Sequence, residues 1–193
     1  MDKVALMNSP VHSDTPMVLK EIEPGLSAYE CPRSGGVWIP LHSYLDWKER
    51  QPVPANAPPA EGRPVLVDDS RQRALICPES GRLLVRYRVG HGLSFHVDQS
   101  PATGGMWLDK GEWAALKSKG LHSQLNLIFT ATYQRQIRSA EYARKLEEVF
   151  QARIGEKDFQ TTSDFRDWLA NHPRRADILC YLNQLEEKPS NEQ

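Results

Sequence analysis

The chain has 193 residues, of which 39% are hydrophobic and 25% are charged, and its formal net charge is -1. This composition is typical of a folded globular chain, and it excludes a disordered or fibrous protein. A net charge so close to zero gives no argument for nucleic acid, membrane or acidic partners. No apolar run approaches the roughly 18 residues that would span a bilayer, and none follows the first Met. We therefore expect a cytoplasmic protein that has no membrane partner.

The three cysteines, Cys31, Cys77 and Cys180, are far apart in the sequence and odd in number. This usage argues against a disulfide framework and fits a reducing compartment.

The predicted elements begin with two β-hairpins, each followed by a short helix. Turn residues separate the strands of each hairpin, Pro24-Gly25 in the first and Gly90-His91-Gly92 in the second. Asp109 followed by Glu112 predicts a capping box at the start of the second helix. The four strands are expected at residues 17–22, 26–31, 83–89 and 93–97.

A Pro-rich stretch, residues 51–64, interrupts the chain between the two hairpins. Because proline removes hydrogen-bond donors and fixes φ, this stretch predicts an extended linker. We divide the chain accordingly into a first unit at 1–50, the linker, a second unit at 65–120 and a helical region at 121–193. The predicted fold class is α+β.

The first and second units carry the same pattern. Each has a Pro-containing turn, a hairpin, a second Pro-containing turn, a Gly-Gly-x-Trp run and a short helical stretch ending in Trp. The two turns are 22 positions apart in the first unit (9 to 31) and 23 in the second (77 to 100). Two copies of one structural unit is the simplest account.

The pattern resembles the transcription-factor-B-type zinc ribbon family, in which C-P-x-C, a hairpin and a second C-P-x-C precede G-G-x-W-L-D-x-G-E. The second copy matches this tail at every fixed position from Gly104 to Glu112, whereas the first departs from it at Ile39-Pro40. The resemblance implies two small ribbons of β-hairpin and short helix. It implies structural roles in the turns and core for Gly35, Gly36, Trp38, Gly104, Gly105, Trp107, Asp109 and Glu112.

Carried over residue by residue, the family's metal-ligand positions fall on Ser9, His12, Cys31 and Ser34 in the first copy, and on Cys77, Ser80, Ser100 and Thr103 in the second. Hydroxyl groups stay protonated near neutral pH and are poor zinc ligands, and closed zinc sites need four donors. We therefore expect no zinc and no other cofactor; if a metal binds, His12 and Cys31 would hold it. The hydroxyls are instead expected to hydrogen-bond the turn amides, and packed Trp side chains would replace the stabilisation that zinc supplies.

The C-terminal region is rich in helix formers. Between residues 123 and 153, apolar residues recur in steps of three and four, which predicts one long helix with one apolar face and an end near Gly155. This face either packs on the ribbons or forms a homodimer through residues 123–153. Two shorter helices follow, and Cys180 in the last of them is expected to be a buried, inert thiol.

Two other groups of residues were considered as functional sites. His91, His96, Asp98 and Ser100 crowd the second hairpin, but they have neither the spacing nor the sharp turn of a nucleophilic triad, so we assign no catalytic residue and expect no enzyme. Arg82, Arg86 and Arg88 are candidate phosphate-contacting residues, although acidic neighbours weaken that interpretation.

The sequence thus predicts a non-catalytic binding or scaffold protein. The resemblance to zinc ribbons favours nucleic acid or the transcription machinery as the partner, by analogy of fold. A protein adaptor that self-associates through the long helix is the alternative, and an enzyme of unknown class is the third.

Overall fold

The structure is a computed structural model that describes residues 7–51 and 73–184. The predicted linker at 51–64 lies outside these ranges, except for Gln51. The chain forms two compact units, unit 1 (Met1–Ser139) and unit 2 (Ala140–Gln193). The α+β prediction is confirmed, because unit 1 contains a six-stranded antiparallel sheet and helices make up the rest of the regular structure.

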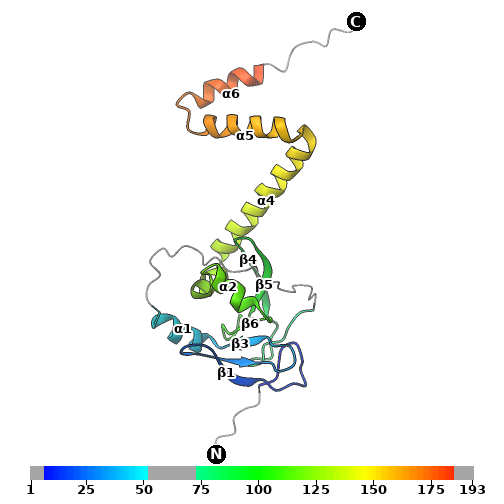
Figure 1. The fold of residues 1–193 in the computed structure, drawn as a ribbon, viewed down its shortest axis with the longest axis vertical. Coiled ribbons are helices and arrows are strands. Elements are labelled where there is room, and N and C mark those ends of the chain that lie inside the picture. The colour runs from blue at the N-terminus through cyan, green and yellow to red at the C-terminus, as the bar shows by residue number, and fades with distance from the viewer. Residues whose placement is uncertain (1–6, 52–72, 185–193) are drawn as a thin grey trace, which may run out of the picture. The chain divides into compact units, whose positions relative to one another are not determined.

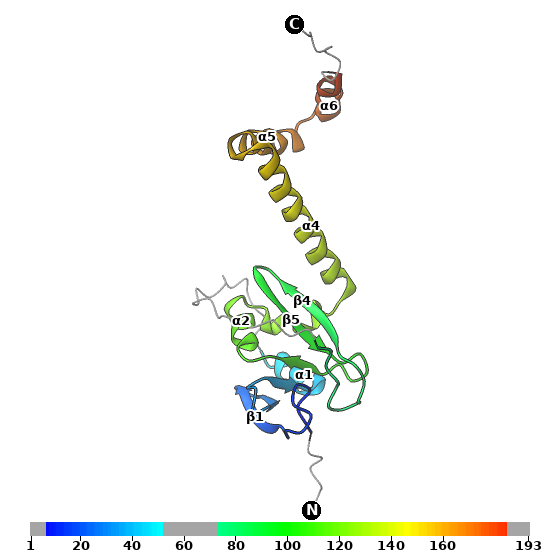
Figure 2. The ribbon, with the colours of Figure 1, turned by 90° about the vertical axis from the view of Figure 1, so that its right-hand side faces the viewer.

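Both copies of the repeat belong to unit 1 and share its one sheet, which Figures 1 and 2 show from two sides. The two hairpins lie within two residues of their predicted positions. Each copy adds a third strand that the sequence analysis did not predict, and each copy then continues into a helix. The first copy contains β1 (Val18–Glu23), β2 (Leu26–Glu30), β3 (Val37–Ile39) and α1 (Leu41–Glu49), and the second contains β4 (Val85–Gly90), β5 (Leu93–Gln99), β6 (Met106–Leu108) and α2 (Glu112–Ser118).

The third strands join the two copies at the centre of the sheet, whose order is β1-β2-β3-β6-β5-β4. Trp38 of β3 lies directly opposite Trp107 of β6. On either side of this pair, Val37 lies opposite Leu108 and Ile39 lies opposite Met106. In the repeat, Val37 corresponds to Met106 and Ile39 corresponds to Leu108, so the pairing is the same when the two copies are interchanged. This register places a local twofold axis between the two tryptophans.

Successive side chains of a strand point to opposite sides of the sheet, so each strand contributes residues to both faces. Both faces are covered by other parts of unit 1. On one face, side chains of β3 and β6 such as Ile39 and Leu108 pack with the buried residues of α1, α2 and α3 (Leu125–Ile128). On the other face, Trp38 and Trp107 pack with the cysteines of the Pro-containing turns. The two tryptophans that the copies share therefore belong to the face that carries the turns.

The predicted capping box is half right. The backbone amide of Asp109 donates to Oε2 of Glu112 at 2.8 Å, as predicted. The Asp109 carboxylate instead accepts a hydrogen bond from Nε1 of Trp107 at 2.8 Å. Helix α2 begins at Glu112, with Gly111 as its N-cap residue and no side-chain hydrogen bond at the cap.

The long helix predicted at 123–153 is interrupted. A 3₁₀ turn η1 (His122–Gln124) and α3 precede α4 (Ala131–Ile154), and the break falls at Phe129 and Thr130. The Thr130 hydroxyl accepts from the amide of Tyr133 at 3.3 Å, which is the bond of a helix N-cap. Phe129 turns inward and packs edge-on against Tyr87 at 5.2 Å.

The boundary between unit 1 and unit 2 lies after Ser139. The first turns of α4 belong to unit 1 because they bind the hairpin: the Tyr133 hydroxyl donates to the carbonyl of Val89 at 2.7 Å, and Ile137 is buried. Gln134 donates to the carbonyl of Arg88 at 2.8 Å and accepts from its amide at 3.3 Å.

Unit 2 contains the rest of α4, α5 (Glu156–Ala170) and α6 (Arg175–Asn183). An ion pair of 3.1 Å joins Arg166 of α5 to Glu147 of α4. Cys180 of α6 is exposed, so the prediction of a buried thiol was wrong. The apolar pattern around Cys180 is that of a core helix, but in the described part of unit 2 only Leu169 is buried. No helix in the described ranges combines the length and the hydropathy that crossing a membrane requires.

Candidate functional site

The Gly-Gly-x-Trp run of each copy holds the tryptophan of the other copy. A Cβ atom at Gly36 would lie 2.3 Å from Cζ2 of Trp107, and a Cβ at Gly105 would lie 2.2 Å from Cζ2 of Trp38. Both indoles are fully buried. The second glycine of each run is therefore needed because the indole of the other copy occupies the place of a side chain.

The first glycine of each run has a different role. Gly35 and Gly104 have φ values of +73° and +74°, a conformation that glycine adopts without strain. Each closes its turn by donating its amide at 2.8 Å, Gly35 to the carbonyl of Cys31 and Gly104 to that of Ser100. These turns are where a zinc ribbon holds its metal.

The indole N–H groups of the two tryptophans have unlike partners. Trp107 donates to Asp109 of its own copy, as described above. Trp38 has Pro40 at the corresponding position, and its Nε1 donates to Oε1 of Glu79 in the second copy at 3.1 Å. The departure from the family tail at Ile39-Pro40 is thus compensated by a carboxylate from the other copy.

In the first copy, two of the other three candidate ligand positions, Ser9 and Ser34, lie around the thiol of Cys31. The Ser9 hydroxyl accepts from the amides of Val11 and His12, each at 3.3 Å, and the Ser34 hydroxyl accepts from the amide of Gly36 at 3.3 Å. Cys31 and Ser9 are buried. His12 lies in the same turn as Ser9, and its carbonyl accepts from the amide of Thr15 at 2.9 Å.

In the second copy, the four corresponding positions come together around Cys77. Its sulfur accepts from the amide of Ser80 at 3.4 Å and lies 3.8 Å from the hydroxyl of Thr103. The Ser100 hydroxyl, which is fully buried, accepts from the amide of Thr103 at 3.2 Å. Each turn therefore has hydroxyl groups that bind the amides of its own backbone, as the sequence analysis expected.

The electrostatics of the two thiols follow from these contacts. Burial raises the pKa of Cys31, but hydrogen bonds from Ser34, from Ser9 and from turn amides outweigh it, so that the pKa lies below the ordinary value for cysteine. The pKa of Cys77 is lowered in the same way, against the effect of burial, by Ser100, by Ser80 and by turn amides.

The donor set does not match a zinc site. Each cluster offers one thiol and a set of hydroxyls, whereas zinc takes thiolate, imidazole or carboxylate ligands. In the part of the chain that the structure describes, no three His, Cys, Asp or Glu side chains converge as metal ligands would. That the protein binds no zinc stays a prediction, which metal analysis of the purified protein can test.

The three candidate phosphate-contacting arginines do not form a uniform basic strip. Arg82 is exposed, at the turn that follows Cys77. Arg86 lies directly opposite Asp98 in the β4–β5 register, where opposite charges attract across the strands. Arg88 is half-buried and its backbone binds Gln134 of α4. Nucleic-acid binding stays a prediction, and this arrangement does not favour it.

Trp47 and Trp113 pack together in an aromatic cluster where α1, α2 and η1 meet, in line with the expected packing of Trp side chains, but the presence of His122 in this cluster was not predicted. Trp47 lies 5.7 Å from Trp113 and 5.8 Å from His122, measured between ring centres. Nε1 of Trp113 donates to Oε1 of Glu23 at 3.0 Å. Burial lowers the pKa of His122, Lys117 lowers it further, and Glu23 opposes both. Trp47 lies near the end of α1 and Trp113 at the start of α2, and these two tryptophans were the signal in the sequence for this contact.

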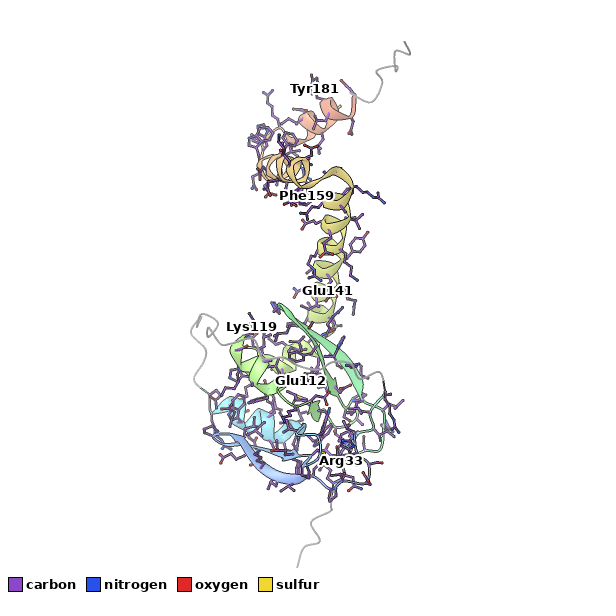
Figure 3. The ribbon with its side chains drawn as sticks, turned by 45° about the vertical axis from the view of Figure 1, so that its right-hand side comes forward. Arg33, Glu112, Lys119, Glu141, Phe159 and Tyr181 are labelled. Atoms are coloured by element: carbon purple, nitrogen blue, oxygen red, sulfur yellow. The ribbon has the colours of Figure 1, made fainter. Side chains whose placement is uncertain are left out.

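Unit 2 leaves much of its apolar surface uncovered within the described residues. Figure 3 shows its side chains, with Phe159 and Tyr181 labelled on α5 and α6. Among the described residues of unit 2, ten large apolar side chains are exposed, including Tyr142 at 71% and Trp168 at 52%. These ten are Tyr142, Leu146, Val149, Phe150, Ile154, Phe165, Trp168, Leu179, Tyr181 and Leu182.

Comparisons with known proteins do not identify this chain. No family model matches it, and neither the search of the curated proteins nor the search of the solved structures found a significant match.

Proposed function

We propose that this protein is a non-catalytic binding protein in which unit 1 is a rigid folded base and unit 2 binds a protein partner through its apolar helices. The observation that carries the proposal is the contrast between ten exposed large apolar side chains and one buried residue in the described part of unit 2. Exposed apolar surface on this scale is a mark of protein interaction sites.

The positions of the exposed residues on α4 show which part of this helix can belong to the proposed binding surface. Ile137 is buried, and Leu146 lies nine residues further along, which is about half a turn around the axis at 3.6 residues per turn. The predicted single face over 123–153 is therefore two faces. The early part, with buried Leu125, Ile128 and Ile137, is used within unit 1, so a homodimer or other interface would use the stripe from Tyr142 to Ile154.

The polar clusters of unit 1 support a structural role for that unit. The hydroxyls of Ser9, Ser34 and Ser100 already accept hydrogen bonds from the turn amides of their own loops. A network with this pattern stabilises a turn and does not need a substrate. We also propose a cytoplasmic location, which the free thiols of Cys31 and Cys77 support because cytosolic thiols stay reduced.

Site-specific photo-crosslinking in cells tests the proposal. A photoreactive amino acid at Tyr142 should give a discrete adduct with one protein, which is then identified and shown to bind the purified chain. The same amino acid at Val18, which is exposed on unit 1, is the control. The double variant Leu146→Glu, Phe150→Glu should abolish the complex, while Lys145→Ala on the polar side of the stripe should retain it.

The mass of the adduct distinguishes a second copy of this chain from a different protein as the partner. An adduct of twice the chain mass, together with a doubled mass in light scattering, would identify the partner as a second copy. Equal labelling at Tyr142 and Val18, or a complex that survives the double variant with unchanged helix content, would overturn the proposal. The variant Phe129→Glu is not suitable as an interface probe, because Phe129 packs on Tyr87 inside unit 1.

A further inference from the structure

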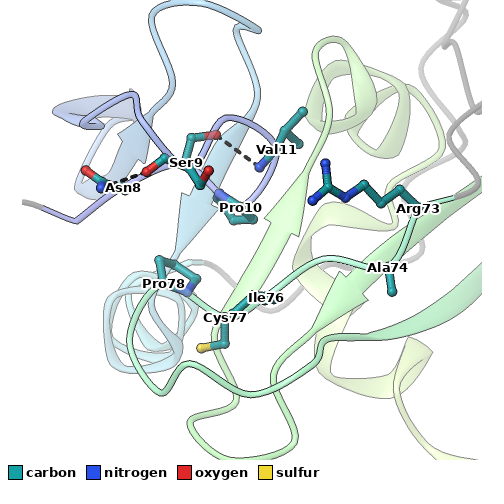
Figure 4. A pocket seen from close by; sticks show the side chains of 10 residues that line it. Asn8, Ser9, Pro10, Val11, Arg73, Ala74, Ile76, Cys77 and Pro78 are labelled. Atoms are coloured by element: carbon teal, nitrogen blue, oxygen red, sulfur yellow. Dashed lines mark hydrogen bonds between the residues drawn. The ribbon is translucent and has the colours of Figure 1, made fainter.

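A pocket of about 230 Å³ opens where the first turns of the two copies meet (Figure 4). The first copy lines it with Asn8, Ser9 and Pro10, and the second copy lines it with the corresponding residues Ile76, Cys77 and Pro78. The pocket thus exists only because the two copies are joined in one sheet. All of its lining residues belong to unit 1.

The two turns that form the walls are held in place by their own backbone bonds. Isolated β-bridges join Asn8 to Pro16 in one turn and Ile76 to Leu83 in the other. The amide of Ser9 donates to the carbonyl of Thr15 at 2.9 Å. A pocket between rigid turns is largely formed before a ligand arrives, which lowers the cost of binding.

Among the described residues that line the pocket, Arg73 is the one with a charged side chain. Figure 4 shows that it extends from the second copy toward Val11 and Pro10 of the first. No hydrogen bond or ion pair joins its side chain to another residue within 7–51 or 73–184. An unpaired guanidinium that points at a concave surface is suited to bind a carboxylate through two parallel hydrogen bonds.

The remaining wall of the pocket is mostly apolar. Pro10, Val11, Ala74, Ile76 and Pro78 contribute carbon surface. Asn8 uses its Nδ2 group to donate to the carbonyl of Ser13 at 2.8 Å, which leaves its Oδ1 as an acceptor at the rim. The volume is below the range of about 300–1,000 Å³ that is typical for drug-sized ligands, so only a group of a few carbon atoms fits.

We propose that this pocket binds a carboxylate attached to a short branched apolar group, with Arg73 as the residue that binds the carboxylate. Two sources share this chemistry, namely a free small carboxylic acid and the C-terminal residue of a peptide that ends in an apolar side chain. A peptide C-terminus also carries an amide N–H that can donate a hydrogen bond to Oδ1 of Asn8, whereas a simple acid has no such donor.

Titrations of the full chain, followed by ¹H–¹⁵N NMR, test this proposal with four probes. Isovalerate and its uncharged analogue isovaleramide test the carboxylate, and a short peptide ending in valine, with a free or an amidated C-terminus, tests the second source. We expect chemical-shift changes at the backbone amides of Asn8, Val11 and Ile76 with isovalerate or with the peptide that has a free C-terminus. We expect no changes with isovaleramide or with the amidated peptide. Tighter binding of the peptide than of isovalerate would identify the peptide C-terminus as the source.

Two variants show whether the binding depends on the pocket. Arg73→Gln should weaken binding at least about tenfold, the usual effect of losing a charged hydrogen bond. Arg82→Gln removes an exposed arginine that does not line the pocket and should leave affinity within about twofold. Ala74→Leu should also weaken binding, because it fills the pocket without touching the charge. Absence of shifts with both carboxylates, equal binding of acid and amide, or undiminished binding by Arg73→Gln would overturn the proposal.

Discussion

The close approach of each tryptophan to the glycine of the other copy gives a quantitative prediction for Gly36→Ala. Gly36 does not lie in the left-handed region, so the added methyl group is the only perturbation. The new Cβ would lie 2.3 Å from Cζ2 of Trp107 and 3.0 Å from the backbone oxygen of Leu108. Ordinary carbon contacts are about 3.5–4.0 Å, so the indole would have to retreat by more than about 1 Å.

Trp107 cannot make that movement cheaply. Its side chain is fully buried, and its Nε1 is held by Asp109 at 2.8 Å. We therefore expect a loss of about 3 kcal/mol in the free energy of unfolding, at the upper end of the range for overpacked cores. For a unit of this size, that corresponds to a fall of about 10 °C in Tm. The local twofold axis predicts the same result for Gly105→Ala, in which the new Cβ would strike Trp38.

Thermal and urea denaturation followed by circular dichroism measure the effect, and a double-mutant cycle assigns its cause. Trp107→Phe removes the ring atoms that the methyl group would strike, so the cost of Gly36→Ala should fall by about 1–2 kcal/mol in that background. Gly92→Ala is the control, because it adds a methyl group in open space at φ +81° and meets only backbone strain. A cost for Gly36→Ala that is unchanged in the Trp107→Phe background would refute the reasoning.

Three further predictions concern the turns, the aromatic cluster and the arginines. Replacing the three hydroxyl residues around Cys77 by cysteine should create a four-thiolate site that binds Co²⁺ with the visible absorption of tetrahedral coordination, whereas a variant with only one of these changes should not; failure of the triple variant to bind would contradict the convergence of the four positions. Because His122 has a lowered pKa in the folded state, its contribution to stability is fully present above the unfolded value of about 6.5 and is lost as pH falls through the folded pKa. The free energy of unfolding should therefore depend less steeply on pH between about 7.5 and 5 in His122→Gln than in the wild type. The control is His42→Gln, at an exposed histidine, and an unchanged slope in His122→Gln would count against this account. If the protein binds nucleic acid through its arginines, a mobility shift should weaken with salt and with Arg82→Ala, and the absence of any shift at low salt would remove that function.

The parts of the fold that could be predicted from the sequence are those with local causes. Turn residues at Pro24-Gly25 and Gly90-His91-Gly92, with alternating apolar residues beside them, predicted both hairpins to within two residues. The repeat itself was visible because the glycines and tryptophans of the two copies keep their spacing. The bond from the amide of Asp109 to the side chain of Glu112 was also predicted, because its two groups lie within four residues of each other in the sequence.

The candidate metal-ligand positions were predicted from a resemblance and not from a local physical cause, yet the structure brings those of the second copy together. Their assignment rested on the spacing of the family that the motif resembles, and the structure gathers Cys77, Ser80, Ser100 and Thr103 from two separate turns. The partner of the Trp38 indole could not be predicted, because Glu79 is 41 residues away and belongs to the other copy. The pocket with Arg73 was also invisible in the sequence, since its two walls come from different turns.

By itself, the sequence determined that this chain contains two related copies of a hairpin followed by a helix, and further helices after them. Only the tertiary structure decided that the two copies form a single sheet within unit 1. The pairing of β3 with β6 is a contact between residues about 70 positions apart, and it depends on the fit of each indole against the glycine of the other copy. The tertiary structure also decided where unit 1 ends, since side-chain bonds from Tyr133 and Gln134 to β4 hold the start of α4. Periodicity along α4 describes an apolar stripe, but which side chains find a partner is settled by packing, which left Ile137 buried and Leu146 exposed.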